Sequence, residues 1–280
     1  MWRSLPLTNC AWQSPHNSRQ QSSGIVKEVL IEFVAPGAVL RLSPIPEGAA
    51  RGVCLVARSV FRFGRSRQTA DFVTWFWPRN PHNDEKTARL GKVQAVAELR
   101  RGRIALRDGD GKRPSANGSQ FDDSHLFADE DTIVHERGTL VLGGDYRVEI
   151  IPIDRPHESE LRIGNIHEWF GPATRPREAR GAVRFQPANS VPVLHDAVWV
   201  FSEASFGAGP GNAVILDVPG LAETAGRFHF HRDCFWVETT GAAGTVRVDD
   251  TALHPGEIAP LATGQTLRIG GVDFRVEIAP

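Results

Sequence analysis

The sequence predicts an all-β protein made of two tandem antiparallel β-sandwiches. The first observation is that short runs of alternating or β-branched residues are separated by turns, as in sandwiches and barrels. The second is the abundance of turn-forming residues, with 27 glycines and 19 prolines among 280 residues. The third is that the pattern of the first half returns in the second, which indicates two copies of one fold.

The expected strands are short and lie between turn signals. In the first half they cover Ile25–Phe33, Val53–Val60, Val93–Leu99, Arg103–Leu106, Thr139–Leu142 and Tyr146–Ile151. In the second half they cover Val198–Phe201, Val214–Leu216, Arg227–Phe230, Cys234–Val237, Thr245–Val248, Thr266–Ile269 and Phe274–Ile278. No long segment shows an apolar period of 3.6 residues, and the best helical candidate is the weakly patterned Glu158–Trp169.

Three pairs of segments carry the internal repeat. They are Ala38–Pro44 with Ala182–Pro187, Ser59–Arg65 with Glu203–Ala208, and Gly144–Ile150 with Val272–Ile278. The first two pairs are separated by the same interval to within one residue, whereas the last pair is closer by about 15 residues. The first copy is therefore expected to contain a loop insertion at residues 72–86.

The repeat sets the expected domain boundaries. Residues 1–24 are rich in Ser, Gln and Asn and are typical of a disordered tail. The first sandwich should span residues 25–153 and the second residues 181–280, which we expect to fold on its own. Residues 154–180 contain several prolines and many charges, which is typical of a linker.

Composition excludes several classes of protein. The net charge of −1 argues against a general binder of nucleic acid or membrane surfaces, which usually carries a basic excess. No run of about 18 apolar residues could form a transmembrane helix. Cys10, Cys54 and Cys234 are far apart and match neither a disulfide framework nor a zinc motif, so we expect a reducing compartment, the cytoplasm.

Several residues in loops of the first half could together bind a phosphate group. Arg65 follows a strand and can offer a forked guanidinium to two phosphate oxygens, with Ser66 beside it. Lys92 supplies a point charge from a neighbouring loop. Asn117 has both an amide donor and an acceptor, which suits a peptide backbone, and Gly118 permits the positive φ that such a turn often requires.

In its order of motifs the first half resembles the forkhead-associated (FHA) domain family. The motifs are Phe63-Gly64-Arg65-Ser66, then the strands Gln94–Leu99 and Arg103–Asp108, then Ser115-Ala116-Asn117-Gly118-Ser119. The resemblance implies a sandwich that binds a phosphothreonine peptide through Arg65, Lys92 and Asn117. Counting back from Asp108 places Lys92, Gly91 and Gln94 on the family's Arg, phosphate-binding Ser and structural His. Ser66 or Thr87 is the candidate to replace the missing hydroxyl.

The second half keeps the strand pattern of the repeat but not the side chains that are expected to bind phosphate. Ala208 occupies the position of Arg65, and Ala243 is expected at the position of Asn117. An anion site without these two groups should not bind phosphate. The second copy is therefore expected to be a structural or docking domain, with Arg227–His231 or Gly241–Gly244 as candidate surfaces.

These features predict a non-enzymatic adaptor that binds a phosphorylated protein in a pathway controlled by Ser/Thr kinases and phosphatases. The partner could be such a kinase or its substrate. The alternative is a scaffold whose sandwiches dock other proteins without any phosphate. No nucleophile arrangement, paired-carboxylate motif or cofactor loop stands out, so we expect no catalytic residue, metal or cofactor.

Three other motifs can be interpreted either as ordinary structural features or as functional sites. His229-x-His231 with Cys234 could hold a metal, but ordinary strand histidines fit better because further ligands are missing. Asp108–Gly111 resembles the start of a calcium loop, but a turn is favoured because its last acidic ligand is absent. The aromatic cluster Trp75–Trp77 is either a plug over the core, which we favour, or an exposed patch for a partner.

Overall fold

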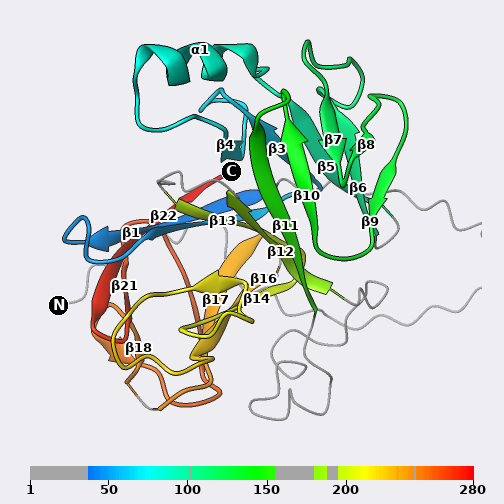
Figure 1. The fold of residues 1–280 in the computed structure, drawn as a ribbon. Coiled ribbons are helices and arrows are strands. Elements are labelled where there is room, and N and C mark those ends of the chain that lie inside the picture. The colour runs from blue at the N-terminus through cyan, green and yellow to red at the C-terminus, as the bar shows by residue number, and fades with distance from the viewer. Residues whose placement is uncertain (1–36, 101–102, 155–179, 188–194, 232, 243) are drawn as a thin grey trace, which may run out of the picture. The chain divides into compact units, whose positions relative to one another are not determined.

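Strands joined by turns make up nearly all of the described fold (Figure 1), which agrees with the all-β prediction. The computed structural model describes residues 37–100, 103–154, 180–187, 195–231, 233–242 and 244–280. The first half contains β1(Ala38–Ile45), β2(Gly52–Ala57), β3(Val60–Gly64), β4(Phe72–Val73), α1(Pro81–Arg89), β5(Ala95–Arg100), β6(Arg103–Asp108), β7(Ser119–Phe121), β8(Ser124–His125), β9(Thr132–Val134), β10(Gly138–Leu142) and β11(Tyr146–Asp154). The second half contains β12(Arg180–Pro187), β13(His195–Val200), β14(Glu203–Gly207), β15(Val214–Ile215), β16(Gly226–His231), β17(Cys234–Thr239), β18(Val246–Val248), β19(Thr251–Ala252), β20(Ile258–Pro260), β21(Thr266–Ile269) and β22(Val272–Ala279).

The strands form one long sheet and two five-stranded sheets. The five-stranded sheets have the orders β4-β3-β5-β6-β9 and β15-β14-β16-β17-β20, which are the same arrangement in the two halves. The long sheet has the order β19-β18-β21-β22-β1-β2-β13-β12-β11-β10-β7-β8. Its two ends are also equivalent, because β7, β8, β10 and β11 correspond to β18, β19, β21 and β22. Each sandwich consists of one five-stranded sheet facing one half of the long sheet.

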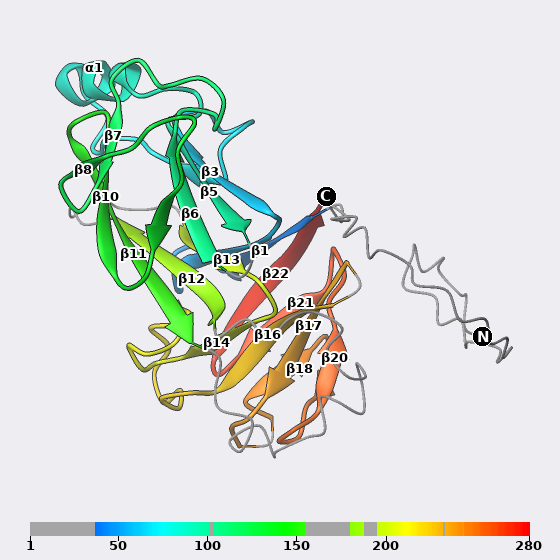
Figure 2. The same cartoon turned by 90° about the vertical axis from the view of Figure 1, so that its right-hand side faces the viewer.

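The two halves of the chain exchange their first hairpins. The β1–β2 hairpin belongs to the first half, but β1 pairs antiparallel with β22 of the second half. In return, β12 of the second half pairs antiparallel with β11 of the first half. Figure 2 shows both junctions, with β1 beside β22 and β11 beside β12.

This exchange corrects the expected domain boundaries. Residues 25–153 and 181–280 do not correspond to two separate sandwiches, because each sandwich contains a hairpin from the other half. The described residues from position 37 onward form a single compact unit. A fragment of residues 181–280 would lack the two strands that extend its sheet beyond β22, so the expectation that it folds on its own is not supported. The expected tail, residues 1–24, lies outside the described residues, as does nearly all of the expected linker.

The centre of the long sheet is buried on both faces. There β2 and β13 run parallel, with Cys54 opposite Ala197. All six residues of β2 are buried, and successive side chains of a strand point to opposite faces. Leu55 therefore packs into the core of the second sandwich, while Val56 packs into the core of the first. Burial on both faces explains why β2 is a continuous run of apolar and small residues rather than an alternating one.

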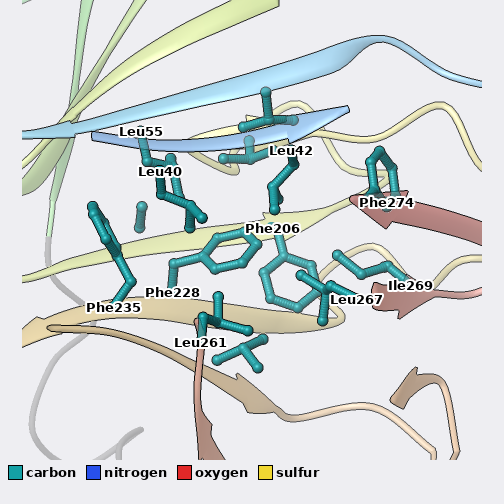
Figure 3. Close-up of a cluster of buried hydrophobic side chains, with 14 of the residues drawn as sticks. Leu40, Leu42, Leu55, Phe206, Phe228, Phe235, Leu261, Leu267, Ile269 and Phe274 are labelled. Atoms are coloured by element: carbon teal, nitrogen blue, oxygen red, sulfur yellow. The ribbon is translucent and has the colours of Figure 1, made fainter. Parts of the chain in front are cut away.

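Each hydrophobic core contains side chains from both halves of the sequence. In the second core, Leu40 and Leu55 of the exchanged hairpin lie over Phe206 and Phe228 (Figure 3). In the first core, Phe185 of β12 packs against Phe61, with ring centroids 4.4 Å apart. Full burial of one such side chain contributes roughly 1.5–3 kcal/mol, so the exchanged strands contribute substantially to both sandwiches.

The insertion in the first half differs from the expected loop. Phe72 and Val73 form the edge strand β4, which pairs with β3 as β15 pairs with β14 in the second half. The inserted residues therefore begin after Val73, and they include the helix α1. Asn80 caps this helix by accepting a hydrogen bond from the Asn83 backbone, and Pro81 occupies its first turn. The helix buries none of its residues, so it has no apolar period by which the sequence could reveal it. Glu158–Trp169, the expected helix, lies outside the described residues.

No helix in the described part of the chain is long and apolar enough to cross a membrane.

Candidate functional site

Two loops of the first sandwich are joined by backbone hydrogen bonds where β3 ends. The amide of Arg65 donates to the carbonyl of Gly91 at 3.0 Å, and the amide of Ser66 donates to the carbonyl of Lys92 at 3.4 Å. Gly64 permits this close approach, because a Cβ atom there would lie 2.1 Å from the Lys92 carbonyl oxygen. The structure therefore brings Arg65, Ser66 and Lys92 together, as the sequence predicts.

Gln94 ties the second of these loops to a third one. Its side chain is fully buried. The side-chain oxygen accepts a hydrogen bond from the Gly91 amide at 2.7 Å, and Nε2 donates to the Ser115 hydroxyl at 2.6 Å and to the Gly118 carbonyl at 2.8 Å. Gln94 thus joins the loop of Gly91 and Lys92 to the loop of Asn117 and Gly118.

Asp108 anchors the third loop from below. This buried carboxylate accepts hydrogen bonds from the Ser115 amide at 2.6 Å, the Ser115 hydroxyl at 2.8 Å and the Ser119 hydroxyl at 2.7 Å. From the sequence, Asp108 was noted as a reference for counting positions and as the start of a calcium-like motif, but this role was missed. The signal was present, since an aspartate that ends a strand precedes two serines in the next turn.

The exposed side chains of the site are cationic or are neutral donors. Arg65 donates through Nε to the Leu90 carbonyl at 2.6 Å, and its two terminal nitrogens have no partner among the described residues. The ammonium group of Lys92 is also exposed and has no partner there. The Ser66 hydroxyl accepts a bond from the Gln68 amide at 3.3 Å, which leaves its proton available.

The third loop contributes Asn117 and Gly118. Nδ2 of Asn117 donates to the Arg89 carbonyl at the end of α1 at 2.5 Å, so one of its amide donors already holds the loop to the insertion. Gly118 has a φ of +63°, which confirms the positive φ expected for this turn. Thr87, the other candidate for the missing hydroxyl, instead donates to the Asn83 carbonyl and accepts from the Phe76 amide. Thr87 does not replace the serine.

Position 91 is closely packed without any side chain. A Cβ atom at Gly91 would lie 2.6 Å from the carbonyl oxygen of Val93. A serine could be placed there only if the backbone moved. The absence of the hydroxyl is therefore part of the local loop geometry.

The aromatic cluster divides between the core and the surface. Phe76 is buried in the first core and packs edge-on against Tyr146, with ring centroids 5.2 Å apart. Trp77 is 48% exposed. Trp75 is half-buried, and its Nε1 donates to the carbonyl of Arg65 at 2.7 Å. Of the three aromatic residues, only Phe76 covers the core as expected.

The motifs with a metal or calcium interpretation have structural roles. His229 is buried, and its Nε2 lies 2.8 Å from a carboxylate oxygen of Glu238. Asp110 accepts hydrogen bonds from the Arg113 and Lys112 amides, which lower its pKa and stabilise the expected turn. No group of residues in the described ranges could hold a metal ion.

The cysteines differ from the expectation. Cys234 is disulfide-bonded. Cys54 is a free thiol, and burial raises its pKa to about 11. A disulfide-bonded Cys234 removes the support that the cysteines were expected to give to a reducing compartment.

Comparison with known proteins gave matches among solved structures only. No protein-family model and no curated protein matches the chain. The complex of Mycobacterium tuberculosis EmbR with a low-affinity phosphopeptide matches at 12% identity and a TM-score of 0.27. That match covers 37% of this chain and 26% of the EmbR chain, so the similarity spans about a quarter of that protein. The FHA domain of CT664 from Chlamydia trachomatis matches at 14% identity and a TM-score of 0.24, covering 33% of this chain and 82% of that domain.

The arrangement of strands is the same in both sandwiches, and the loops at the end of β3 meet as the resemblance implied. The described strands form two β-sandwiches, as the sequence predicts.

The second sandwich repeats the backbone of the site with other side chains. The Ala208 amide donates a hydrogen bond to the Ala222 carbonyl. The Arg65 amide donates to the Gly91 carbonyl in the same way. A Cβ atom at Gly207 would lie 2.3 Å from the carbonyl oxygen of Glu223, just as one at Gly64 would lie close to that of Lys92. Glu223 therefore occupies the position of Lys92. Ala225 occupies the position of Gln94. Its backbone amide donates to the Phe206 carbonyl, and the backbone amide of Gln94 donates to the Phe63 carbonyl.

The position of Asn117 in this sandwich is one residue from the expected one. The Gly270 amide donates a hydrogen bond to the Thr245 carbonyl, and the Gly143 amide of the first sandwich donates to the Gly118 carbonyl in the same way. Thr245 therefore matches Gly118, and Gly244 matches Asn117. Ala243, the residue expected there from the sequence, lies outside the described residues.

Proposed function

We propose that the first sandwich binds a phosphothreonine-containing segment of another protein, and that the chain is a non-enzymatic adaptor in signalling by Ser/Thr kinases and phosphatases. The observation that supports this best is the exposed Arg65 guanidinium. Its Nε is fixed on the Leu90 carbonyl, while its terminal nitrogens have no partner among the described residues. The ammonium group of Lys92, on the adjoining loop, also has no partner in the part of the chain that the structure describes. A fixed forked donor and a second free cation suit a phosphate group.

Each loop would contribute one kind of contact. Arg65 would donate to two phosphate oxygens, Lys92 would supply a point charge, and the Ser66 hydroxyl would donate one further hydrogen bond. Asn117 would contact the peptide backbone through its side-chain oxygen. The bonds made by Gln94 and Asp108 hold these loops before any ligand arrives, which lowers the entropic cost of binding.

The glycine at position 91 should make this site weaker than one with a serine. A hydrogen bond to a charged group contributes about 1.5–3 kcal/mol, and about 1.4 kcal/mol corresponds to a tenfold change in affinity. We therefore expect modest affinity.

The proposed partner is a phosphorylated protein, such as a Ser/Thr kinase or its substrate. The groups that meet at the site are cations and neutral donors, which favours binding over catalysis. We propose the cytoplasm as the compartment on the basis of kinase signalling alone, because the cysteines do not support it.

A phosphopeptide-library screen on the full chain, followed by calorimetry, tests the proposal. A selected phosphothreonine peptide should bind and its unphosphorylated form should not. Affinity should fall as the pH drops below about 6, because the phosphate then loses its second negative charge. Equal affinity for the two peptides would instead support the second candidate function, a phosphate-independent docking scaffold. The missing hydroxyl at Gly91 is the observation that favours this alternative.

A further inference from the structure

Next to the candidate phosphate site lies a second group of cations, which the proposed function does not use. The Arg67 guanidinium lies 4.3 Å from the centre of the Trp75 ring, and that of Arg79 lies 5.2 Å from the same centre. The indole nitrogen of Trp75 donates to the carbonyl of Arg65. We name Arg67, Trp75 and Arg79 the arginine–tryptophan stack.

The stack carries charge that is not neutralised. Arg79 is paired with Asp84 at 2.5 Å. Arg67 is exposed and has no carboxylate partner among the described residues, as is also true of Arg65 two residues earlier. Because Asp84 neutralises Arg79, Arg67 leaves a net positive charge beside the ring, and an anion placed there would be attracted to it.

The stack is also positioned by the rest of the site. The turn that carries Arg67 is closed by hydrogen bonds from the Thr69 and Ala70 amides to the Ser66 carbonyl. Because Trp75 is bonded to the backbone of Arg65, the ring and the phosphate site belong to one local unit. A guanidinium stacked on such a ring has already lost part of its rotamer freedom, so less is lost when it binds an anion.

We propose that the arginine–tryptophan stack is a second anion subsite, and that the protein prefers phosphopeptides with another anionic group close to the phosphorylated residue. This inference rests on the proposed function, since it presumes that a phosphopeptide lies at Arg65. The shared chemistry is a carboxylate or a second phosphate. A second phosphate should give the larger gain, because it carries about 1.5–2 negative charges at neutral pH.

A positional scan tests the inference. The probe is a phosphothreonine peptide with neutral flanks, into which one aspartate is placed at each flanking position in turn, and binding to the full chain is measured by calorimetry. We expect aspartate at one or two adjacent positions to increase affinity about two- to fivefold, the range of an exposed ion pair. Phosphoserine at the same position should increase it further; no further gain would identify the second group as a carboxylate.

The variant Arg67→Gln should remove this gain and leave affinity for the neutral-flank peptide unchanged. The control Arg275→Gln, which changes an exposed residue of β22, should retain the gain. If the neutral-flank peptide binds but no aspartate improves it, or if Arg67→Gln keeps the gain, the inference is wrong while the proposed function stands. If no phosphopeptide binds at all, the proposed function fails, and the inference fails with it.

Discussion

The loop ends of the two sandwiches share a backbone and differ in almost every side chain that could touch a ligand. Arg65, Lys92 and Asn117 of the first sandwich correspond to Ala208, Glu223 and Gly244 of the second. The glycine that permits close approach of the loops is present in both, as Gly64 and Gly207. The frame is therefore kept by backbone packing and hydrogen bonds, whereas the proposed anion binding would depend on a few exposed groups. Glu223 would repel a phosphate where Lys92 would attract it.

The strongest test of this comparison concerns the hairpin exchange. Leu55→Ala should destabilise the second sandwich by about 2–5 kcal/mol, although Leu55 lies in the first half of the sequence, because it empties space in the second core. Hydrogen exchange should speed up first in β16 and β17. The control Val56→Ala, on the opposite face of the same strand, should affect β3 and β5 instead. If Leu55→Ala loosened β3 and β5 alone, the assignment of the hairpin would be wrong.

Gln94 offers the next largest effect. Gln94→Ala leaves the partly buried Gly91 amide without an acceptor and the Gly118 carbonyl without this donor. We expect a loss of about 2–4 kcal/mol in the free energy of unfolding, measured by chemical denaturation, since each unsatisfied buried group costs about 1–3 kcal/mol. Gln120→Ala, near the surface of β7, should change stability by less than about 0.5 kcal/mol. An equally mild effect of Gln94→Ala would show that the loops do not depend on it.

The fold class and the loops of the site could be predicted from the sequence, but the hairpin exchange could not. β1 and β12 have similar sequences, so either one could pair with β11 or β22. The one hint was the run Gly52–Ala57, which is apolar throughout because both of its faces are buried. The helix α1 was missed because it buries nothing. Glu223 was missed because its equivalence to Lys92 rests on a backbone contact.

Asn117 should have a smaller role, confined to the site. Asn117→Ala removes the bond to the Arg89 carbonyl and the proposed contact with the peptide backbone. We expect phosphopeptide binding to weaken by about 0.5–1.5 kcal/mol in calorimetry, with little change in the thermal midpoint. A greater loss than that caused by Arg65→Ala would show that the proposed roles are reversed.

The smallest effect concerns a surface ion pair of the second sandwich. Hydrogen bonds from Arg268 lower the pKa of Asp273 below its usual value of 3.8. The pair therefore adds stability above that value, and this contribution is lost as the pH falls through the lowered pKa. Because both side chains are partly exposed, Asp273→Asn should cost only a few tenths of a kcal/mol at pH 7 and nothing near pH 2, by urea denaturation. A cost that persisted at pH 2 would mean that Asp273 acts by packing.

The central claim is that the chain has one phosphopeptide site and that Arg65 forms it. Calorimetric titration of the full chain with a selected phosphothreonine peptide measures the stoichiometry directly. We predict one site per chain, no binding to Arg65→Ala, and an unchanged thermal midpoint for that variant. Two sites per chain, or undiminished binding by Arg65→Ala, would contradict the account.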